Sequence, residues 1–200
     1  MSEIGALTRR LREELAAQGE EPPAYAPIAP ATVRGASQRY GLPSAYRELL
    51  AALGQEGFTI SPGPFRAIVL YAAPDLEAAQ VGFRGPRPGD ESFVAPHGWH
   101  RSWVVIATDA GDPYFLDVTK ADARGECPVY TAMHGTGTWE PLLAASSVEQ
   151  YLCILDVWLR IVLPHHDRQN PDEPLDELHT RRLAAEIARI DPAAAPQWQQ

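Results

Sequence analysis

The sequence predicts an α+β protein in which an antiparallel β-sheet is packed by helices from both ends of the chain. Three observations lead to this class. Apolar residues follow helical spacing near both termini, residues 99–143 hold a succession of short β segments, and the connections between these segments are short enough for antiparallel neighbours. A length of 200 residues and a hydrophobic content of 45% fit one globular domain with appendages.

An N-terminal amphipathic helix is predicted within residues 1–19, followed by a proline-rich linker over residues 20–30. Ser2 is placed to cap the helix and Gly19 to end it, and the apolar stripe falls at spacings of three and four: Ile4, Leu7, Leu11 and Leu15. Four prolines make the linker extended and semi-stiff. We therefore expect the helix to be an appendage that docks either on the body or on a second copy, so a homodimer through the terminal helices stays open.

The main body, residues 31–163, is predicted to begin with helices. A short helix from residue 31 ends at Gly41, and a second helix is capped by Ser44 and ends at Gly54. Residues 67–71 form a β-branched run typical of a strand, and a brief helix follows between residues 74 and 82. Residues 84–98 are rich in proline and glycine and are predicted to form a long loop.

Four further β segments, separated by turn residues, are predicted at 103–108, 114–118, 128–134 and 139–143. A capping box of Ser146 and Glu149 begins an apolar helix that Pro164 ends. A C-terminal extension over residues 164–200 holds one helix between Pro174 and Pro192, and then a tail with little to hold it.

The charge of the chain restricts its partners. There are 26 acidic and 17 basic residues, which makes a net charge of −9. Such a surface repels nucleic acid and anionic membranes and attracts a protein with a basic face. Lys120 is the only lysine, a bias typical of GC-rich bacterial genes; two cysteines are too few for a disulfide framework, and no signal peptide is recognised. We therefore expect a cytoplasmic bacterial protein that binds neither nucleic acid nor membranes.

Candidate catalytic and metal-binding groups are present but do not form a recognised set. His97 and His100, with an aspartate of the 109–112 turn, lack a spacing that sets metal geometry, and histidines at residues 165–166 are explained by a helix C-terminus. Cys127 with His134 is the candidate nucleophile pair, yet no helix N-terminus follows the cysteine to lower its pKa. The sequence therefore predicts no catalytic residues, no metal and no cofactor.

Several short motifs together resemble the SUKH superfamily, which includes bacterial immunity proteins and fungal cell-wall assembly regulators of the Smi/Knr type. Leu42-Pro43 followed by Tyr46, Leu49-Leu50 and Leu53-Gly54 is similar to the opening of that family. The strand 103–109 running into Gly111-Asp112-Pro113 is similar to its central hairpin. The resemblance covers about residues 31–159 and implies an α+β fold and, in bacteria, a noncatalytic protein that neutralises a toxin.

The leading hypothesis for function is an immunity protein that binds and neutralises a cognate contact-dependent toxin, possibly of the nuclease type. The contact candidates are acidic or aromatic residues of the long loop and the hairpin tip: Asp90, Glu91, Phe93, Trp99, Asp109 and Asp112. The alternative is a regulatory or scaffold protein of the cell-wall regulator type. A hydrolase comes third, and it requires Cys127, or His97 and His100, to converge with acidic partners in one pocket.

Overall fold

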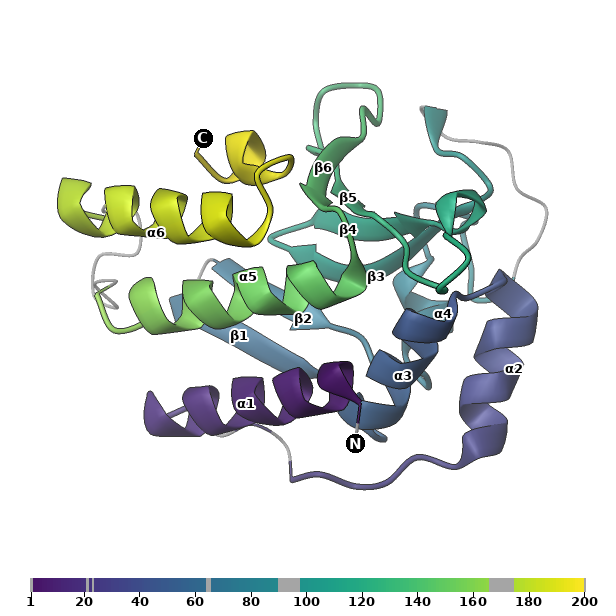
Figure 1. Cartoon of the computed structure of the whole chain (residues 1–200). Helices are drawn as coiled ribbons and strands as arrows, with labels where there is room; N and C mark the ends of the chain where they lie inside the picture. The colour runs from purple at the N-terminus through teal and green to yellow at the C-terminus, as the bar shows by residue number, and fades with distance from the viewer. Residues whose placement is uncertain are drawn as a thin grey trace.

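Six β-strands form one antiparallel sheet whose spatial order follows the chain, from β1 to β6 (Figure 1). The strands are β1 (Phe58–Gly63), β2 (Arg66–Leu70), β3 (Trp103–Asp109), β4 (Asp112–Asp117), β5 (Val129–Thr131) and β6 (Leu142–Ala145). The computed structural model describes residues 2–20, 22, 24–63, 66–89, 98–165 and 175–199. Apart from the short helix at Leu76–Ala79, between β2 and β3, the α-helices precede and follow the sheet in the chain, so the predicted α+β class is confirmed.

Side chains alternate between the two faces of the sheet. Val104 pairs with Leu116, and both are buried in the main core. The next pair, Val105 and Phe115, belongs to a separate cluster on the opposite face. This alternation follows from the period of two in a β-strand.

Two parts of the sheet differ from the sequence-based expectation. Strand β1 was not predicted, because Pro62 and Gly63 are residues that weaken a strand pattern. The segment expected at 139–143 instead pairs as β6, which begins at Leu142, after Pro141. Proline has no N–H to donate to a neighbouring strand, so pairing begins beyond it.

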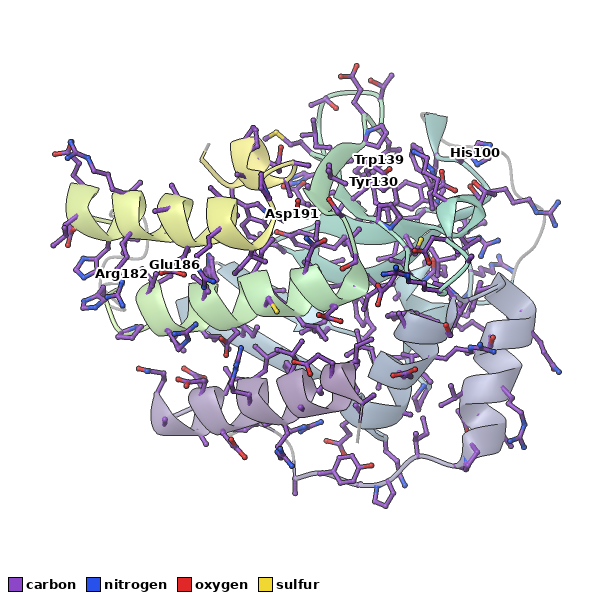
Figure 2. The ribbon with its side chains drawn as sticks, in the orientation of Figure 1. His100, Tyr130, Trp139, Arg182, Glu186 and Asp191 are labelled. Carbon is purple, nitrogen blue, oxygen red and sulfur yellow. The ribbon has the colours of Figure 1, made fainter. Side chains whose placement is uncertain are left out.

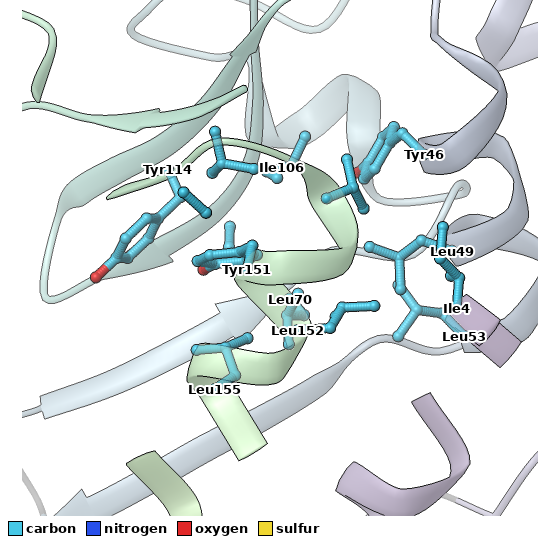
Figure 3. Close-up of a cluster of buried hydrophobic side chains, with 14 of the residues drawn as sticks. Ile4, Tyr46, Leu49, Leu53, Leu70, Ile106, Tyr114, Tyr151, Leu152 and Leu155 are labelled. Atoms are coloured by element: carbon cyan, nitrogen blue, oxygen red, sulfur yellow. The ribbon is translucent and has the colours of Figure 1, made fainter. Parts of the chain in front are cut away.

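Six helices are present in the described residues. They are α1 (Glu3–Ala17), α2 (Pro30–Tyr40), α3 (Ser44–Leu53), α4 (Leu76–Ala79), α5 (Val148–Ile161) and α6 (Glu177–Ile190). In Figure 1, α5 lies between α1 and α6. The core lies beneath this layer, where side chains from α1, α3, α5 and the strands meet, as Figure 3 shows for Ile4, Leu49, Leu70 and Leu152. None of the described helices has the length and apolarity needed to cross a membrane.

The N-terminal helix α1 is part of the body and not a detached appendage. Its stripe, from Ile4 to Leu15, is buried against α3 and α5 in the main core. On the other side of the interface, the carboxylate of Asp156 is 1% exposed and receives two hydrogen bonds from the Arg10 guanidinium, at 2.8 and 2.7 Å. Since the stripe is covered within the chain, it is not free for a second copy. A dimer through α6, where Leu178 is 73% exposed, stays a prediction.

The C-terminal extension also packs on the body, contrary to the expected loose tail. Asp191, labelled in Figure 2, is buried and accepts hydrogen bonds from the backbone N–H and the hydroxyl of Ser146. A 3-10 helix, Ala195–Gln199, follows it. The indole Nε1 of Trp198 donates to the carbonyl of Ala144 in β6 at 2.8 Å. These long-range contacts have no local sequence signal.

Candidate functional site

The face of the sheet turned away from α5 carries a cluster of aromatic rings, which we call the aromatic face. Its centre is Trp99, whose ring centroid lies 4.8 Å from that of Phe83 and 4.9 Å from that of Phe115. Around this centre are half-buried aromatic side chains, each partly open to solvent: Tyr71, Phe83, Trp103, Tyr130 and Trp139. Aromatic rings with one side open are typical of protein-binding surfaces.

Trp99 lies inside this cluster, whereas the sequence analysis placed it among the contact residues. It is 1% exposed, because Trp103 and Trp139 both pack edge-on against it. In this arrangement Trp99 supports the surface, and the half-buried rings of Tyr130 and Trp139, labelled in Figure 2, form it. Sequence reasoning missed these two residues. The period-two alternation of Trp103 and Val105 with Val104 and Ile106 is the signal from which a second apolar face could have been predicted.

At the aromatic face, the side chain of Gln80 forms backbone hydrogen bonds to β3 that a neighbouring strand would otherwise form. Strand β2 pairs with β3 only from Ala107 to Asp109, so the backbone of Val105 lies beyond its reach. The buried amide of Gln80 fills this place: Oε1 accepts from Val105 N at 3.0 Å, and Nε2 donates to Val105 O at 2.9 Å. Both backbone groups are thereby satisfied at a position where a bulge interrupts the β3–β4 register.

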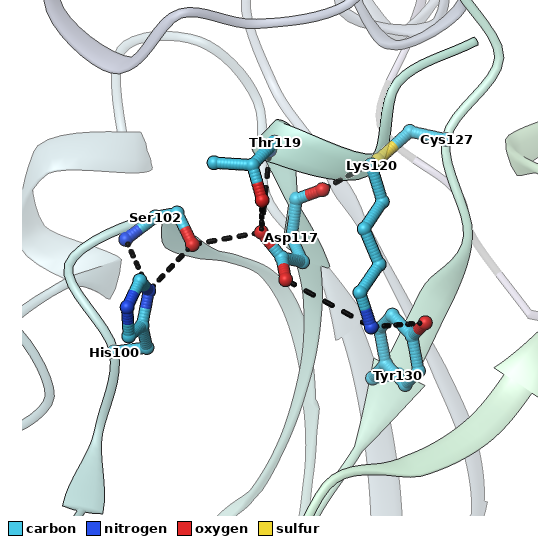
Figure 4. A network of polar contacts seen from close by, with 7 residues as sticks. All are labelled: His100, Ser102, Asp117, Thr119, Lys120, Cys127 and Tyr130. Atoms are coloured by element: carbon cyan, nitrogen blue, oxygen red, sulfur yellow. Dashed lines mark hydrogen bonds and ion pairs between the residues drawn. The ribbon is translucent and has the colours of Figure 1, made fainter.

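A polar network borders the aromatic face at the end of β4 (Figure 4). Its centre is the buried carboxylate of Asp117, which accepts from the hydroxyl of Ser102 at 2.7 Å and from that of Thr119 at 2.6 Å. Burial by itself raises the pKa of Asp117, but the hydrogen bonds from Thr119 and Ser102 outweigh it and hold the pKa below its usual value. Lys120 Nζ lies 3.9 Å from the same carboxylate and donates to the hydroxyl of Tyr130 at 2.9 Å.

The order of groups in this network is not that of a hydrolytic triad. The Nδ1 of His100 lies 2.7 Å from Ser102 Oγ, and Ser102 donates its proton to Asp117. In a triad the histidine stands between the hydroxyl and the carboxylate and removes the hydroxyl proton. Here the serine stands in the middle, so the network joins the start of β3 to the end of β4 without activating a nucleophile.

Cys127 is buried and does not meet His134. Its thiol donates to the backbone carbonyl of Asp117 at 3.1 Å, and burial, reinforced by the charges of Asp117 and Glu126, raises its pKa to about 12. His134 lies beyond the other end of β5 and contacts Asp112. A protonated thiol is a poor nucleophile, so this pair does not form the proposed reactive site.

The tip of the β3–β4 hairpin brings Asp109 and Asp112 to one end of the sheet. The two central turn residues, Ala110 and Gly111, both have positive φ angles, 49° and 99°. Such turns match the twist of the flanking strands. Asp112 Oδ1 accepts from His134 N at 2.7 Å and lies 2.6 Å from His134 Nδ1, which joins the hairpin to the loop after β5.

The remaining predicted contacts, Asp90, Glu91 and Phe93, lie outside the described residues, as does His97. Among the residues that the structure does describe, no group of three or more histidine, cysteine, aspartate or glutamate side chains is arranged to hold a metal ion. The features that stand out are therefore surfaces for contact: the aromatic face and the acidic hairpin tip.

The fold is that of an α+β protein, and the aromatic face and the hairpin tip are its candidate contact surfaces. The model of the SMI1/KNR4 family, also called SUKH-1, matches residues 27–153, which is more than half of the chain. The chain therefore belongs to the SMI1/KNR4 family within the SUKH superfamily, as the sequence motifs predicted. No curated protein and no solved structure matches the chain. Helices α1 and α6 and the second half of α5 lie outside the matched residues.

Proposed function

We propose that this SUKH-1 protein is a noncatalytic bacterial immunity protein that binds and neutralises a cognate toxin in the cytoplasm. The observation that carries the proposal is the charge: a family member with 26 acidic and 17 basic residues offers carboxylates to a basic partner. Nuclease toxins bind phosphate backbones and need basic clefts, so a carboxylate-rich surface is complementary to them. The alternative within the same family is a regulatory scaffold for other host proteins.

The arrangement of the polar groups supports a binding function over a hydrolytic one. Ser102 donates its proton to a carboxylate, and burial keeps the thiol of Cys127 protonated. The aromatic face adds half-buried rings, of which Trp103 and Trp139 are the largest. Tryptophan and tyrosine are enriched among the residues that dominate the energy of protein interfaces.

The direct test is a binding experiment between the purified chain and the product of the adjacent gene. We expect a stable complex and protection of cells that express the toxin. The immunity proposal fails if the adjacent product forms no complex and the chain gives no protection. A complex with host proteins instead, combined with an isolated gene, supports the scaffold alternative.

Charge variants then test the predicted contact residues of the long loop. In Asp90→Lys with Glu91→Lys, we expect association with the toxin to slow by about tenfold or more at low salt, with a smaller difference at high salt. Glu13→Lys with Glu48→Lys is the matched control, because both residues are exposed on helices distant from the loop in the sequence and change the net charge equally. Equal association rates for the two variants would remove the loop from the proposed interface.

A further inference from the structure

A cavity of about 290 Å³ opens between the hairpin tip and the C-terminal extension. The β3–β4 hairpin supplies Asp109, Asp112 and Tyr114, while α5, α6 and the 3-10 helix supply Trp158, Leu183 and Trp198. Figure 1 shows this C-terminal segment, in yellow, above α5 and beside β6. The volume lies just below the roughly 300–1,000 Å³ range of ligand pockets, so it suits one side chain better than a large cofactor.

The walls of this cavity combine aromatic rings with carboxylates. The rings of Tyr114 and Trp198 are nearly parallel, with an interplanar angle of 17° and centroids 6.2 Å apart, and Trp158 adds a third ring. The carboxylates are those of Asp109 and Asp112. No lysine, arginine or histidine belongs to the lining among the described residues. Aromatic faces attract cations through their quadrupole, and carboxylates attract them through charge.

One basic side chain, His134, lies nearby and contacts one of these carboxylates. Oδ1 of Asp112 accepts from the backbone N–H of His134 and lies within hydrogen-bond distance of its ring Nδ1. Asp112 remains 31% exposed on its side chain, and within the described residues its Oδ2 has no hydrogen-bond partner. The cavity therefore keeps an acceptor oxygen for a donor that enters from outside.

The aromatic and acidic walls come from two different parts of the chain. Asp109, Asp112 and Tyr114 lie within the family match at residues 27–153, whereas Trp158 and Trp198 lie beyond it. Trp198 is fixed in the wall by its hydrogen bond to the Ala144 carbonyl. The C-terminal extension thus completes a site that the matched region by itself leaves open.

We propose that this cavity receives an arginine side chain of the partner protein, an inference that rests on the proposed function in requiring a protein partner. Arginine fits better than lysine because its planar guanidinium stacks on aromatic rings and donates several hydrogen bonds to carboxylates at once. A partner with a basic face, as the net charge of −9 favours, carries such a residue.

The test uses a small probe, so it does not depend on the identity of the toxin. Nuclear magnetic resonance follows the indole N–H signals while N-acetyl-arginine-methylamide is added to the full chain. We expect saturable shifts for Trp158 and Trp198, with a dissociation constant in the millimolar range. The signals of Trp103 and Trp139, on the aromatic face, serve as the internal control and should stay in place.

Two comparisons decide whether charge recognition is responsible. The citrulline analogue has nearly the same shape without the charge, and we expect it to bind at least about tenfold more weakly. Asp109→Asn with Asp112→Asn should weaken arginine binding by a similar factor, while the exposed Asp75→Asn leaves it unchanged. If the double variant fails to fold, the comparison of arginine with citrulline on the native chain still decides.

Three results would overturn the inference: no shift of Trp158 and Trp198, equal binding of citrulline, or equal binding of N-acetyl-leucine-methylamide, which is added as an apolar probe. The last result would mark the cavity as a site for apolar side chains. If the toxin binds and the arginine probe does not, arginine recognition by the cavity is refuted and the immunity function still stands. If the arginine probe binds and no toxin complex forms, the immunity function is refuted and arginine recognition still stands, so the two failures are distinguishable.

Discussion

The docking of α1 on α5 can be tested through the ion pair at its centre, by the substitution Arg10→Ala. The Asp156 carboxylate is 1% exposed and receives two hydrogen bonds from Arg10 and one from Arg160 at 3.0 Å. Bonds to charged groups contribute roughly 1.5–3 kcal/mol each, and removing one partner of a fully buried pair costs about 3–5 kcal/mol. Arg10 is itself half-exposed, and Arg160 remains as a partner, so we expect a smaller loss of about 2 kcal/mol.

Arg9→Ala is the control for this prediction. Arg9 is the preceding residue of the same helix, and its pair with Glu13 is exposed on both sides with an N–O distance of 3.7 Å. Exposed pairs contribute about 0.5 kcal/mol, and alanine is a good helix former in both variants. Arg10→Lys, which keeps the charge but not the paired geometry, should fall between the two.

Urea unfolding followed by circular dichroism measures these differences. A loss of about 2 kcal/mol corresponds to a decrease of roughly 4–8 °C in Tm for a chain of this size. In the double variant Arg10→Ala with Asp156→Ala, a coupling energy of about 1–2 kcal/mol should appear. Equal stabilities of Arg10→Ala and Arg9→Ala, or a coupling energy near zero, would refute the docking of α1 through this pair.

Three further predictions concern the residues that hold the aromatic face and its polar network. Gln80→Leu should destabilise the chain by about 2–4 kcal/mol in the same urea assay, since it leaves the N–H and carbonyl of Val105 buried without partners; a loss under about 0.5 kcal/mol would contradict this. In a Cys153→Ala background, Cys127 should react with a thiol reagent at pH 8 only on unfolding, and labelling of the native chain at the rate of a free cysteine would contradict this. Because the thiol of the unfolded chain ionises first, the raised pKa of Cys127 should make the free energy of unfolding fall as the pH rises from about 9 toward 12. Asp117, with a lowered pKa, should contribute stability above pH 4 that is lost as the pH falls below it. In Asp117→Asn the free energy of unfolding should therefore depend less on pH in acid, and an unchanged pH dependence would exclude this contribution.

In the proposed interface, the aromatic face would supply nonspecific apolar contacts and the cavity beside Asp112 one specific contact. The half-buried rings of the aromatic face, such as Trp139, offer apolar area that many partners can use. The cavity beside Asp112 offers one charged and directional contact. Because the extension completes this cavity, SUKH-1 proteins that lack Trp158 and Trp198 would not share it. Partner choice can therefore differ between members of the family that have the same sheet.

Much of the secondary structure was predictable because its signals are local. Ser2 caps α1 and accepts from Gly5 N, and Gly41 ends α2 with a φ of 67°. The cap of α5 is Ser147, one residue after the predicted Ser146, and it accepts from Gln150 N. Each of these signals acts within four residues of the helix end. Strand β1 escaped prediction because Pro62 and Gly63 weaken its pattern, whereas its pairing with β2, in the register of Phe58 with Leu70, depends on residues outside the segment.

The candidate site was less predictable than the fold. Turn chemistry placed Asp109 and Asp112 at a hairpin tip, and the structure places both there. Composition alone could not show that Trp99 is enclosed by other rings, since an aromatic residue in a loop reads the same whether it is buried or exposed. It also could not show that Tyr130 and Trp139 share a surface with it.

The sequence by itself determined the α+β class, most helix ends, the acidic charge and the family, because these depend on neighbouring residues, on totals or on short motifs. Only the tertiary structure decided that α1 belongs to the body and that Trp198 closes a cavity beside Asp112. Arg10 and Asp156 are 146 positions apart, and Trp198 reaches Ala144 across 54 positions. Contacts over such separations depend on how apolar faces pack around a shared core, and no pattern along the chain records which faces meet.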